Sequence, residues 1–192
     1  SDHYLSNTTP IQFLLETIFG HSLLKKCPSL LKGITATALC QARTEKAGLC
    51  KDMSALFVLA GNSFGDPKYT ILQEVIAQNP SLLKEIPVEA LCRTIATIKE
   101  IENMTALHYF CTHQAGRKFL HQLFNANPNL LHAIPTAVWC LPLGSKANVG
   151  FQKTPIFHLS LTLDGLNLLW LMFEKKPQLI ESDALLKTLF VL

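Results

Sequence analysis

Three side chains that could act as nucleophile, base or metal ligand lie close together in the sequence: His108, Cys111 and His113. A thiol beside an imidazole is the arrangement of cysteine-dependent transferases and hydrolases, because the base generates the attacking thiolate. Joined by His121, the same side chains could also hold a soft metal ion. On a helix, however, offsets of three and five residues place His113 off the face that the other two share. We therefore expect no metal, no other cofactor and no catalytic residue here.

The cysteine pattern gives no further indication of catalysis or of metal binding. There are six, widely spread and without a Cys-x-x-Cys pair: Cys27, Cys40, Cys50, Cys92, Cys111 and Cys140. This favours reduced thiols in a cytosol over a disulfide or zinc framework. Three of them recur at equivalent places in an internal repeat described below, which indicates small buried apolar side chains. A catalytic cysteine should differ from the cysteines at equivalent positions of the other copies, and nothing in the sequence marks one out. The protein is therefore not expected to be an enzyme; a cysteine-dependent enzyme using Cys111 is the alternative.

The amino-acid composition and net charge argue against nucleic acid and a lipid membrane as partners. Of 192 residues, 48% are hydrophobic and 16% charged, so the chain must bury large surfaces and is not disordered. A net charge of +3 is too small and too dispersed for a nucleic-acid or anionic-membrane footprint. The most apolar stretch, residues 156–173, contains His158, Asp164 and Asn167, which would be costly in lipid. We expect neither nucleic acid nor a membrane span.

The elements that must position these side chains repeat along the chain. Four openers, which begin at Thr9, Ser54, Thr105 and Thr154, are 45, 51 and 49 residues apart. A glycine follows each opener 11 residues later, at positions 20, 65, 116 and 165. Next comes an apolar stretch that ends in a tetrad similar to Pro-x-Leu-Leu, starting at Pro28, Pro80, Pro128 and Pro177. Such a register indicates one unit copied four times.

A further element follows the tetrad in the first three copies. It reads ITATALC at 34–40, IPVEALC at 86–92 and IPTAVWC at 134–140, and its cysteine lies 12 residues after the tetrad proline. The fourth copy has only the related run ESDALL at 181–186. We therefore predict a short third helix in three copies, started by Thr35, Pro87 or Pro135, and a diverged segment in the last.

The repeated unit reads as two helices joined by a tight turn. The Thr or Ser of each opener can accept a hydrogen bond from the first turn, which predicts the start of a first helix. Apolar residues then recur at helical spacing up to the glycine, which we expect to end this helix in a left-handed conformation. The second helix should stop before the tetrad proline, since the residue preceding a proline is pushed out of helical geometry.

One unit cannot bury both of its helices, so neighbouring copies must cover them. We predict an all-α solenoid of four helix-turn-helix repeats, each with the added short third helix. The chain is expected to form a single domain over 1–192, with repeats at about 9–53, 54–104, 105–153 and 154–192. The last residues, 184–192, are apolar where a terminal repeat usually presents a polar cap, so the chain is expected to be part of a longer protein.

The third opener, Thr105-Ala106-Leu107-His108, resembles the Thr-Pro-Leu-His signature of ankyrin repeats. That resemblance implies that the His108 ring hydrogen-bonds the opener threonine and neighbouring loops. The period near 50 differs from the 33 of ankyrin repeats, and Asn-Pro replaces their usual turn. Long, diverged repeats of this kind are similar to those of effectors that intracellular bacteria secrete into host cells, which implies a host protein as partner and the host cytosol as location.

The segments between the third helix and the next opener vary most, and on a repeat scaffold such inserts commonly form the binding face. Together with an exposed side of the first helices they should give an extended concave surface. We expect its charged residues and two aromatic anchors to contact another protein: Arg43, Lys46, Lys51, Arg93, Lys99, Lys146, Lys153, Trp139 and Phe151. The alternatives are an ordinary solvated rim, or a targeting or regulatory part of a larger enzyme.

Overall fold

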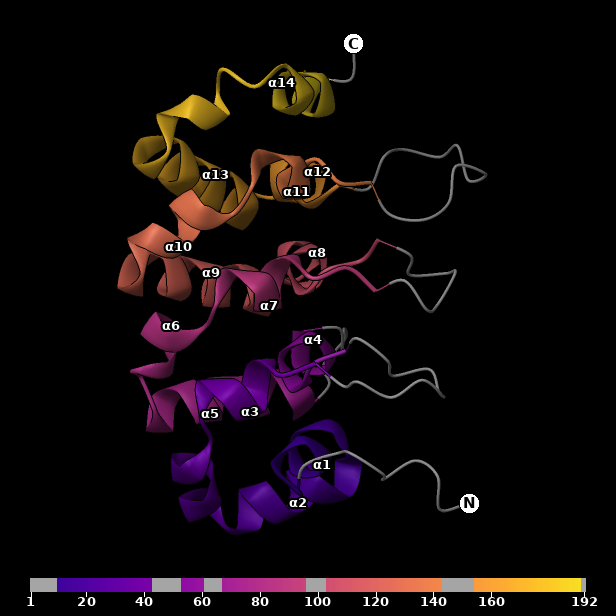
Figure 1. The fold of residues 1–192 in the computed structure, drawn as a ribbon, viewed down its shortest axis with the longest axis vertical. Helices are drawn as coiled ribbons and strands as arrows, with labels where there is room; N and C mark the ends of the chain where they lie inside the picture. The colour runs from indigo at the N-terminus through magenta and orange to yellow at the C-terminus, as the bar shows by residue number, and fades with distance from the viewer. Residues whose placement is uncertain (1–9, 43–52, 61–66, 96–102, 143–153, 191–192) are drawn as a thin grey trace.

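The computed structural model describes residues 10–42, 53–60, 67–95, 103–142 and 154–190, and these are mostly helical with no strand. The helices form layers stacked along the long axis of the molecule (Figure 1). Each copy of the repeat supplies one layer. The prediction of an all-α protein is therefore confirmed for the described part of the chain.

Each layer holds a first helix, a second helix, a short helix over the tetrad and a third helix. Layer 1 comprises α1 (Pro10–Glu16), α2 (Ile18–Lys26), η2 (Pro28–Gly33) and α3 (Ala36–Cys40). Layer 2 comprises α4 (Ala55–Ala60), α5 (Pro67–Gln78), α6 (Leu82–Glu85) and α7 (Val88–Cys92). Layer 3 comprises α8 (Ala106–Thr112), α9 (Gln114–Ala126), α10 (Pro128–Ala133) and α11 (Thr136–Trp139). Layer 4 comprises α12 (Pro155–Ser160), α13 (Leu163–Lys175), η4 (Pro177–Leu179) and α14 (Asp183–Phe190).

Two elements differ from expectation. The tetrad, predicted only to end the second helix, forms a short helix of its own, because its proline occupies the first helical position in η2, α10 and η4, where no donor is needed. The diverged segment of the fourth copy also remains helical, as α14, which packs on α12 and α11.

Three of the four openers start first helices as predicted, and Thr9 lies outside the described residues. Thr105 Oγ1 accepts a hydrogen bond from the N–H of His108 at 3.3 Å, and Thr154 Oγ1 from that of Phe157 at 3.1 Å. Ser54 makes the equivalent bond to Phe57 at 3.1 Å. These bonds satisfy donors that would otherwise be buried without a partner.

In the three copies where it is described, the recurring glycine does not end the first helix, so that prediction is wrong there; Gly65 lies outside the described residues. Gly20, Gly116 and Gly165 lie inside the second helix, three residues after an extended residue that makes the turn. A methyl group on Gly116 would come within 3.0 Å of the backbone of Phe110, and the other two glycines face their first helices in the same way. The glycine is needed because the two helices approach too closely for a side chain.

The proline that follows does stop the second helix. Cys27, Asn127 and Lys176, the residues before three of the tetrad prolines, share one non-helical conformation, with φ of −129°, −139° and −137° and ψ of 69°, 78° and 73°. Steric conflict with the proline ring explains why the same break recurs.

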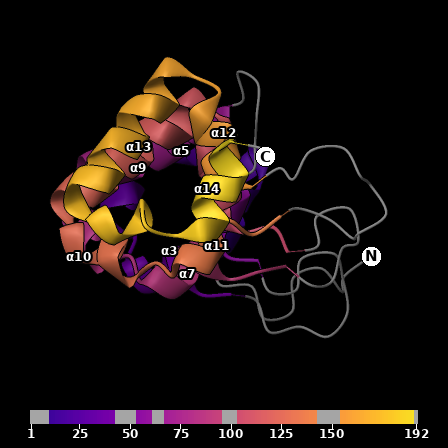
Figure 2. The same ribbon diagram turned by 90° about the horizontal axis from the view of Figure 1, so that it is seen from above.

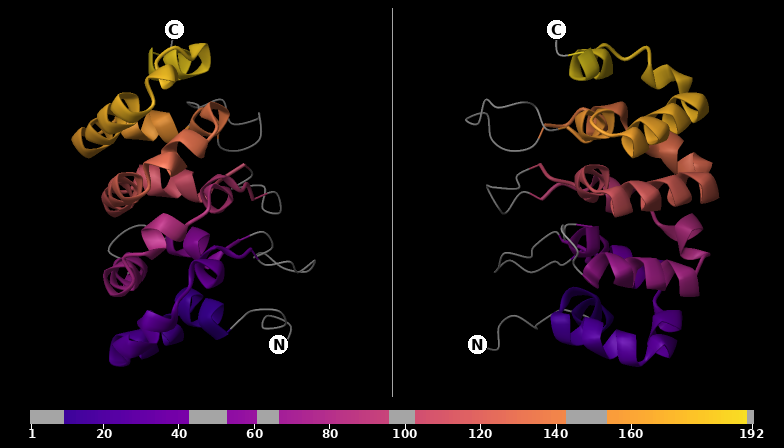
Figure 3. Two further views of the ribbon diagram at one scale, coloured as in Figure 1. Left: turned by 60° about the vertical axis from the view of Figure 1, so that its left-hand side comes forward. Right: turned by 180° about the vertical axis from the view of Figure 1, so that it is seen from behind.

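Equivalent helices lie over one another in columns, as the views along and across the stack show (Figures 2 and 3). First helices pack in the order α1, α4, α8, α12, and second helices in the order α2, α5, α9, α13. Each third helix also packs on the first helix of the next layer. Most residues of α4 and α8 are buried, so the expectation that first helices present an exposed concave side is wrong: third helices cover them.

Candidate protein-binding face

The described ends of the inserts leave the stack on one side, to the right in Figure 1. At the second insert the two ends are tied together: the N–H of Ile95 donates to the carbonyl of Met104 at 3.0 Å, and the N–H of Asn103 donates to Ile95 at 3.2 Å. Asn103 has φ of 66°, a left-handed conformation that asparagine tolerates better than most residues. The stem of this insert is thus fixed on the stack.

His108 fixes the start of the third insert. Its Nε2 lies 2.8 Å from the carbonyl oxygen of Leu141, which can only accept, so Nε2 carries the proton. Its Nδ1 then accepts from Thr105, from Oγ1 at 2.8 Å and from the backbone N–H at 3.2 Å. The ring therefore joins the opener to Leu141, two residues after α11. The hydrogen bonds that the ankyrin resemblance implied are confirmed.

The His108 ring is neutral. Burial lowers its pKa to about 4, against a smaller upward effect of the bond to Leu141 and a further lowering by nearby His158. Both ring nitrogens are already used in the hydrogen bonds to Thr105 and Leu141. The geometry thus gives His108 a positioning role.

The third helices form a ladder beside these stems, at the front of Figure 1. Equivalent residues of the seven-residue motif at 34–40, 86–92 and 134–140 have similar exposure. The first residue, an isoleucine, and the sixth residue are buried in all three copies, whereas the second and fourth residues are exposed. We call the exposed set the third-helix face; its residues are Thr35, Thr37, Pro87, Glu89, Pro135 and Ala137. The fourth position thus presents threonine, glutamate and alanine in turn on an otherwise regular surface.

A depression of about 330 Å³ lies between the first two rungs of this ladder. It is lined by residues of α3 and its end and of the α6–α7 junction: Ala36, Thr37, Cys40, Gln41, Glu85 and Pro87. Apolar walls with a few polar groups at the edge suit a protruding side chain of a partner. Because the depression lies between two layers, residues far apart in sequence form it.

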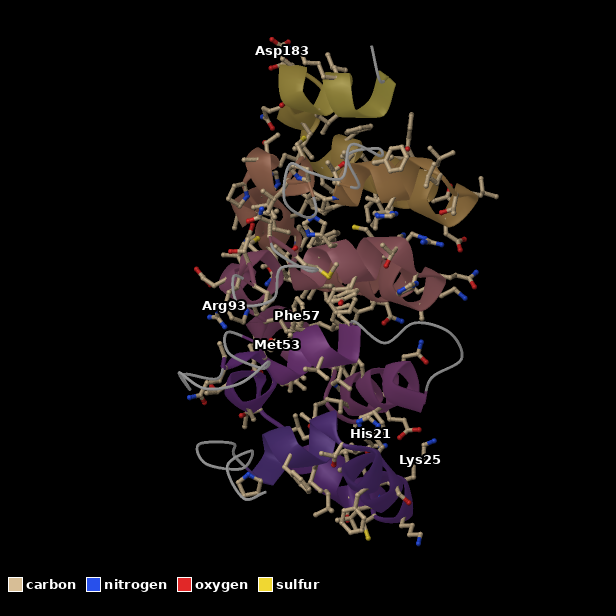
Figure 4. The ribbon with its side chains drawn as sticks, turned by 90° about the vertical axis from the view of Figure 1, so that its right-hand side faces the viewer. His21, Lys25, Met53, Phe57, Arg93 and Asp183 are labelled. Carbon is tan, nitrogen blue, oxygen red and sulfur yellow. The ribbon has the colours of Figure 1, made fainter. Side chains whose placement is uncertain are left out.

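Of the predicted contact residues, Arg93 lies on this side. It follows α7, is half-buried, and its charge acts on Cys40 in the wall of the depression. Figure 4 views the side from which the inserts leave, with Arg93 at the edge where the third helices lie. Arg43, Lys46, Lys51, Lys99, Lys146, Phe151 and Lys153 lie outside the described residues.

Trp139 is no anchor, and that prediction is wrong. Its side chain has no exposed surface and packs edge-on against Phe124, with ring centroids 6.2 Å apart. The repeat register explains this, because Trp139 occupies the slot of Leu39 and Leu91, which are equally buried. A large aromatic residue simply fills the same core position in layer 3.

Sequence reasoning missed the polar rim of the depression, which Thr37, Gln41 and Glu85 provide. A partial signal was present, because the fourth position of the motif reads threonine, glutamate and alanine in the three copies. Alignment of the three copies could have singled out Thr37, but not its closeness to Glu85.

Cys40, Cys92 and Cys111 lie in the packed part of the stack, whereas Cys27 is exposed and Cys50 lies outside the described residues. Cys111 is fully buried, and burial raises its pKa, so the attacking thiolate is disfavoured. Burial likewise raises the pKa of Cys40 to about 12 and of Cys92 to about 11. The arrangement that would support a Cys111 nucleophile is therefore not favoured by the surroundings of this thiol.

Within the part of the chain that the structure describes, no three His, Cys, Asp or Glu side chains are grouped so that they could hold a metal ion. No described helix is both long and apolar enough to cross a membrane. Comparison with protein-family models, curated proteins and solved structures finds no match to this chain.

Proposed function

We propose that this protein is a binding module without catalytic activity, an ankyrin-like solenoid whose third-helix face and insert stems hold another protein. The observation that carries the proposal is the ladder of exposed third-helix positions, where residue type varies while the backbone repeats. Repeat proteins commonly bind through such a surface, since a regular scaffold keeps variable side chains in a fixed array.

The depression between α3 and α7 supports the same proposal. It offers a recess for one side chain of the partner, with Glu85 at its rim and Arg93 beside it. Opposite charges close to an apolar recess orient the partner's side chain as well as contributing to its affinity. The adjoining inserts carry further lysines and arginines, which would extend the contact.

The partner proposed is a protein of a host cytosol, in keeping with the resemblance to secreted bacterial effectors. The second candidate is a targeting or regulatory domain that positions an enzyme on its substrate. Both use the same face, so one experiment addresses both.

The experiment is quantitative capture of proteins from a eukaryotic cytosol on the immobilised chain. Thr37→Arg together with Ala137→Arg places bulk and charge on two exposed rungs without touching the core. The control is Lys118→Glu together with Gln122→Arg, exposed residues of α9 on the second-helix side. The proposal requires a protein that is retained by the wild type and the control but at least tenfold depleted by the rung variant; equal retention on all three would contradict it.

Charge reversal at Lys146 and Lys153 extends this test to the third insert. If the insert contributes to the contact, capture should weaken while the thermal unfolding midpoint is unchanged. Unaltered capture would limit the contact to the third helices and stems.

A further inference from the structure

The two ends of the stack expose apolar residues whose counterparts are buried in every other layer. The third tetrad position points toward the preceding layer: Leu82, Leu130 and Leu179 are 3%, 5% and 0% exposed, whereas Leu30 of layer 1 is 45% exposed. Layer 1 has no described layer before it. Among the described residues, Leu30 therefore lacks the cover that its counterparts have.

The fourth tetrad position shows the converse. Leu31, Leu83 and Leu131 are 1%, 8% and 0% exposed under the following layer, whereas Ile180 of layer 4 is 48% exposed. The tetrad thus has one apolar residue for each neighbour. One kind of contact is left open at each end of the stack.

One position of the second helices repeats this relationship. In α9 the residue after the glycine is Arg117, which is buried with α13 stacked on α9 and donates to the carbonyl of Cys111 at 3.0 Å. In α2 the same position is His21, which is also buried. In α13 it is Leu166, which is 49% exposed. Leu166 therefore adds an apolar side chain to the open face of layer 4.

The two terminal layers also differ in net charge. In the described part of layer 1, Lys25, Lys26 and Lys32 stand against one glutamate, whereas layer 4 carries four carboxylates, Asp164, Glu174, Glu181 and Asp183, against three lysines. Figure 4 shows Lys25 in the lower part of the stack and Asp183 at its top. Opposite net charges favour contact between unlike ends over contact between like ends.

We propose that copies of this chain associate head to tail, with layer 1 of one copy seated on layer 4 of the next. The contact would continue the internal interface: α2 of the second copy would lie on α13 as α13 lies on α9, and Leu30 would gain the cover that Leu82 and Leu130 have. Such a heterologous contact leaves one open face at each end of the pair, so assembly grows with concentration.

The association is reversible and weaker than the internal contacts. Asn79, Asn127 and Lys176 each donate a hydrogen bond to a carbonyl of the preceding tetrad segment. The equivalent residue of layer 1 is Cys27, whose thiol is only a weak donor. The intermolecular contact therefore rests on apolar burial and charge, without this recurring hydrogen bond.

The test is sedimentation velocity of the whole chain over a wide range of protein concentration. The weight-average mass should rise past that of a dimer as concentration increases. One variant alters the layer 1 face, Leu30→Glu, and another alters the layer 4 face, Leu166→Glu with Ile180→Glu. Each should weaken self-association by tenfold or more, and Lys118→Glu on α9 should leave it unchanged. Because every altered side chain is exposed, circular dichroism should show an unchanged fold.

Mixing the two variants distinguishes head-to-tail association from a symmetric dimer. Each variant keeps one intact face, so the mixture should form a one-to-one dimer and nothing larger. A wild type that stays monomeric throughout, a mixture that stays monomeric, or a layer 1 variant that still dimerises through its layer 4 face would each overturn the proposal.

Discussion

The side-chain amide of Asn79 donates a hydrogen bond of 2.6 Å to the carbonyl oxygen of Leu31, 48 residues earlier in the chain. The side-chain amide of Asn127 likewise donates to the carbonyl oxygen of Lys84 at 3.3 Å, and the ammonium group of Lys176 donates to the carbonyl oxygen of Ile134 at 2.8 Å. All three donors precede a tetrad proline, and all three acceptors lie in or next to the tetrad segment of the layer before. At least one side-chain hydrogen bond thus joins each pair of successive described layers, and Lys176 adds a second, to the carbonyl oxygen of His132.

Replacing Asn79 with alanine should lower the free energy of unfolding by about 1–3 kcal/mol, because the carbonyl of Leu31 would lose this partner. Urea unfolding measures the change. The matched control is Asn125→Ala, which removes only an exposed contact with His121 and should cost less than about 0.5 kcal/mol. Equal effects of the two substitutions would show that the bond between layers does not contribute to stability.

Replacing Gly116 with alanine should destabilise the protein by about 1–3 kcal/mol or more, since the methyl group would overlap the backbone of Phe110 and force α8 and α9 apart. The control is Gly33→Ala, where nothing lies within 4 Å of the added carbon. There the change should be neutral or stabilising by up to about 1 kcal/mol, because alanine has less freedom to lose on folding. Similar losses in both variants would contradict the close-approach explanation.

These glycines show what the repeat register predicts and what it cannot. The 11-residue spacing from opener to glycine correctly marked a boundary between two helices. It did not place Gly116 on either side of that boundary, because glycine serves both left-handed caps and close helix contacts. Only the distance to Phe110, a tertiary quantity, decides between these two roles.

His108 should make stability depend on pH. Its pKa is about 4 in the folded protein and near 6.5 when unfolded, so between these values the unfolded chain binds a proton that the folded protein does not. Stability should therefore be complete above about pH 6.5 and fall on acidification by up to about 1.4 kcal/mol per pH unit. Urea midpoints at neutral pH and at pH near 5 measure this for the wild type and for His108→Gln.

The glutamine variant should be less stable at neutral pH but lose less on acidification. His121→Gln, at an exposed position of α9, should keep the wild-type dependence. An unchanged slope in His108→Gln would mean that other groups titrate in this range, among them His113, whose pKa burial also lowers.

Thiol labelling at neutral pH should distinguish Cys27 from the other described cysteines. Cys27 is exposed, whereas Cys111 is fully buried and burial raises the pKa of its thiol, as it does for Cys40 and Cys92. Peptide mapping should find rapid modification at Cys27 and modification of Cys111 only after denaturation. A fast-reacting Cys111 in the folded protein would favour the enzyme alternative instead.

The candidate face was only partly readable from the sequence. Helix starts at Thr105 and Thr154 follow from local hydrogen bonding, and so were predictable. The depression beside Cys40 was not, because Glu85 and Thr37 belong to different layers and meet only through stacking. Trp139 is not an anchor because it shares the sixth motif position with Leu39 and Leu91, and a position that holds leucine in the other two copies is a core position.

Site-specific photocross-linking tests the binding face most directly. A photoreactive amino acid at Thr37, on the ladder and in the wall of the depression, is compared with the same group at Lys118, exposed on α9. After irradiation in a eukaryotic cytosol, Thr37 should yield a discrete adduct with one other protein, distinct in mass from a cross-linked pair of this chain, and Lys118 should not. An adduct from Lys118 but none from Thr37 would contradict the account.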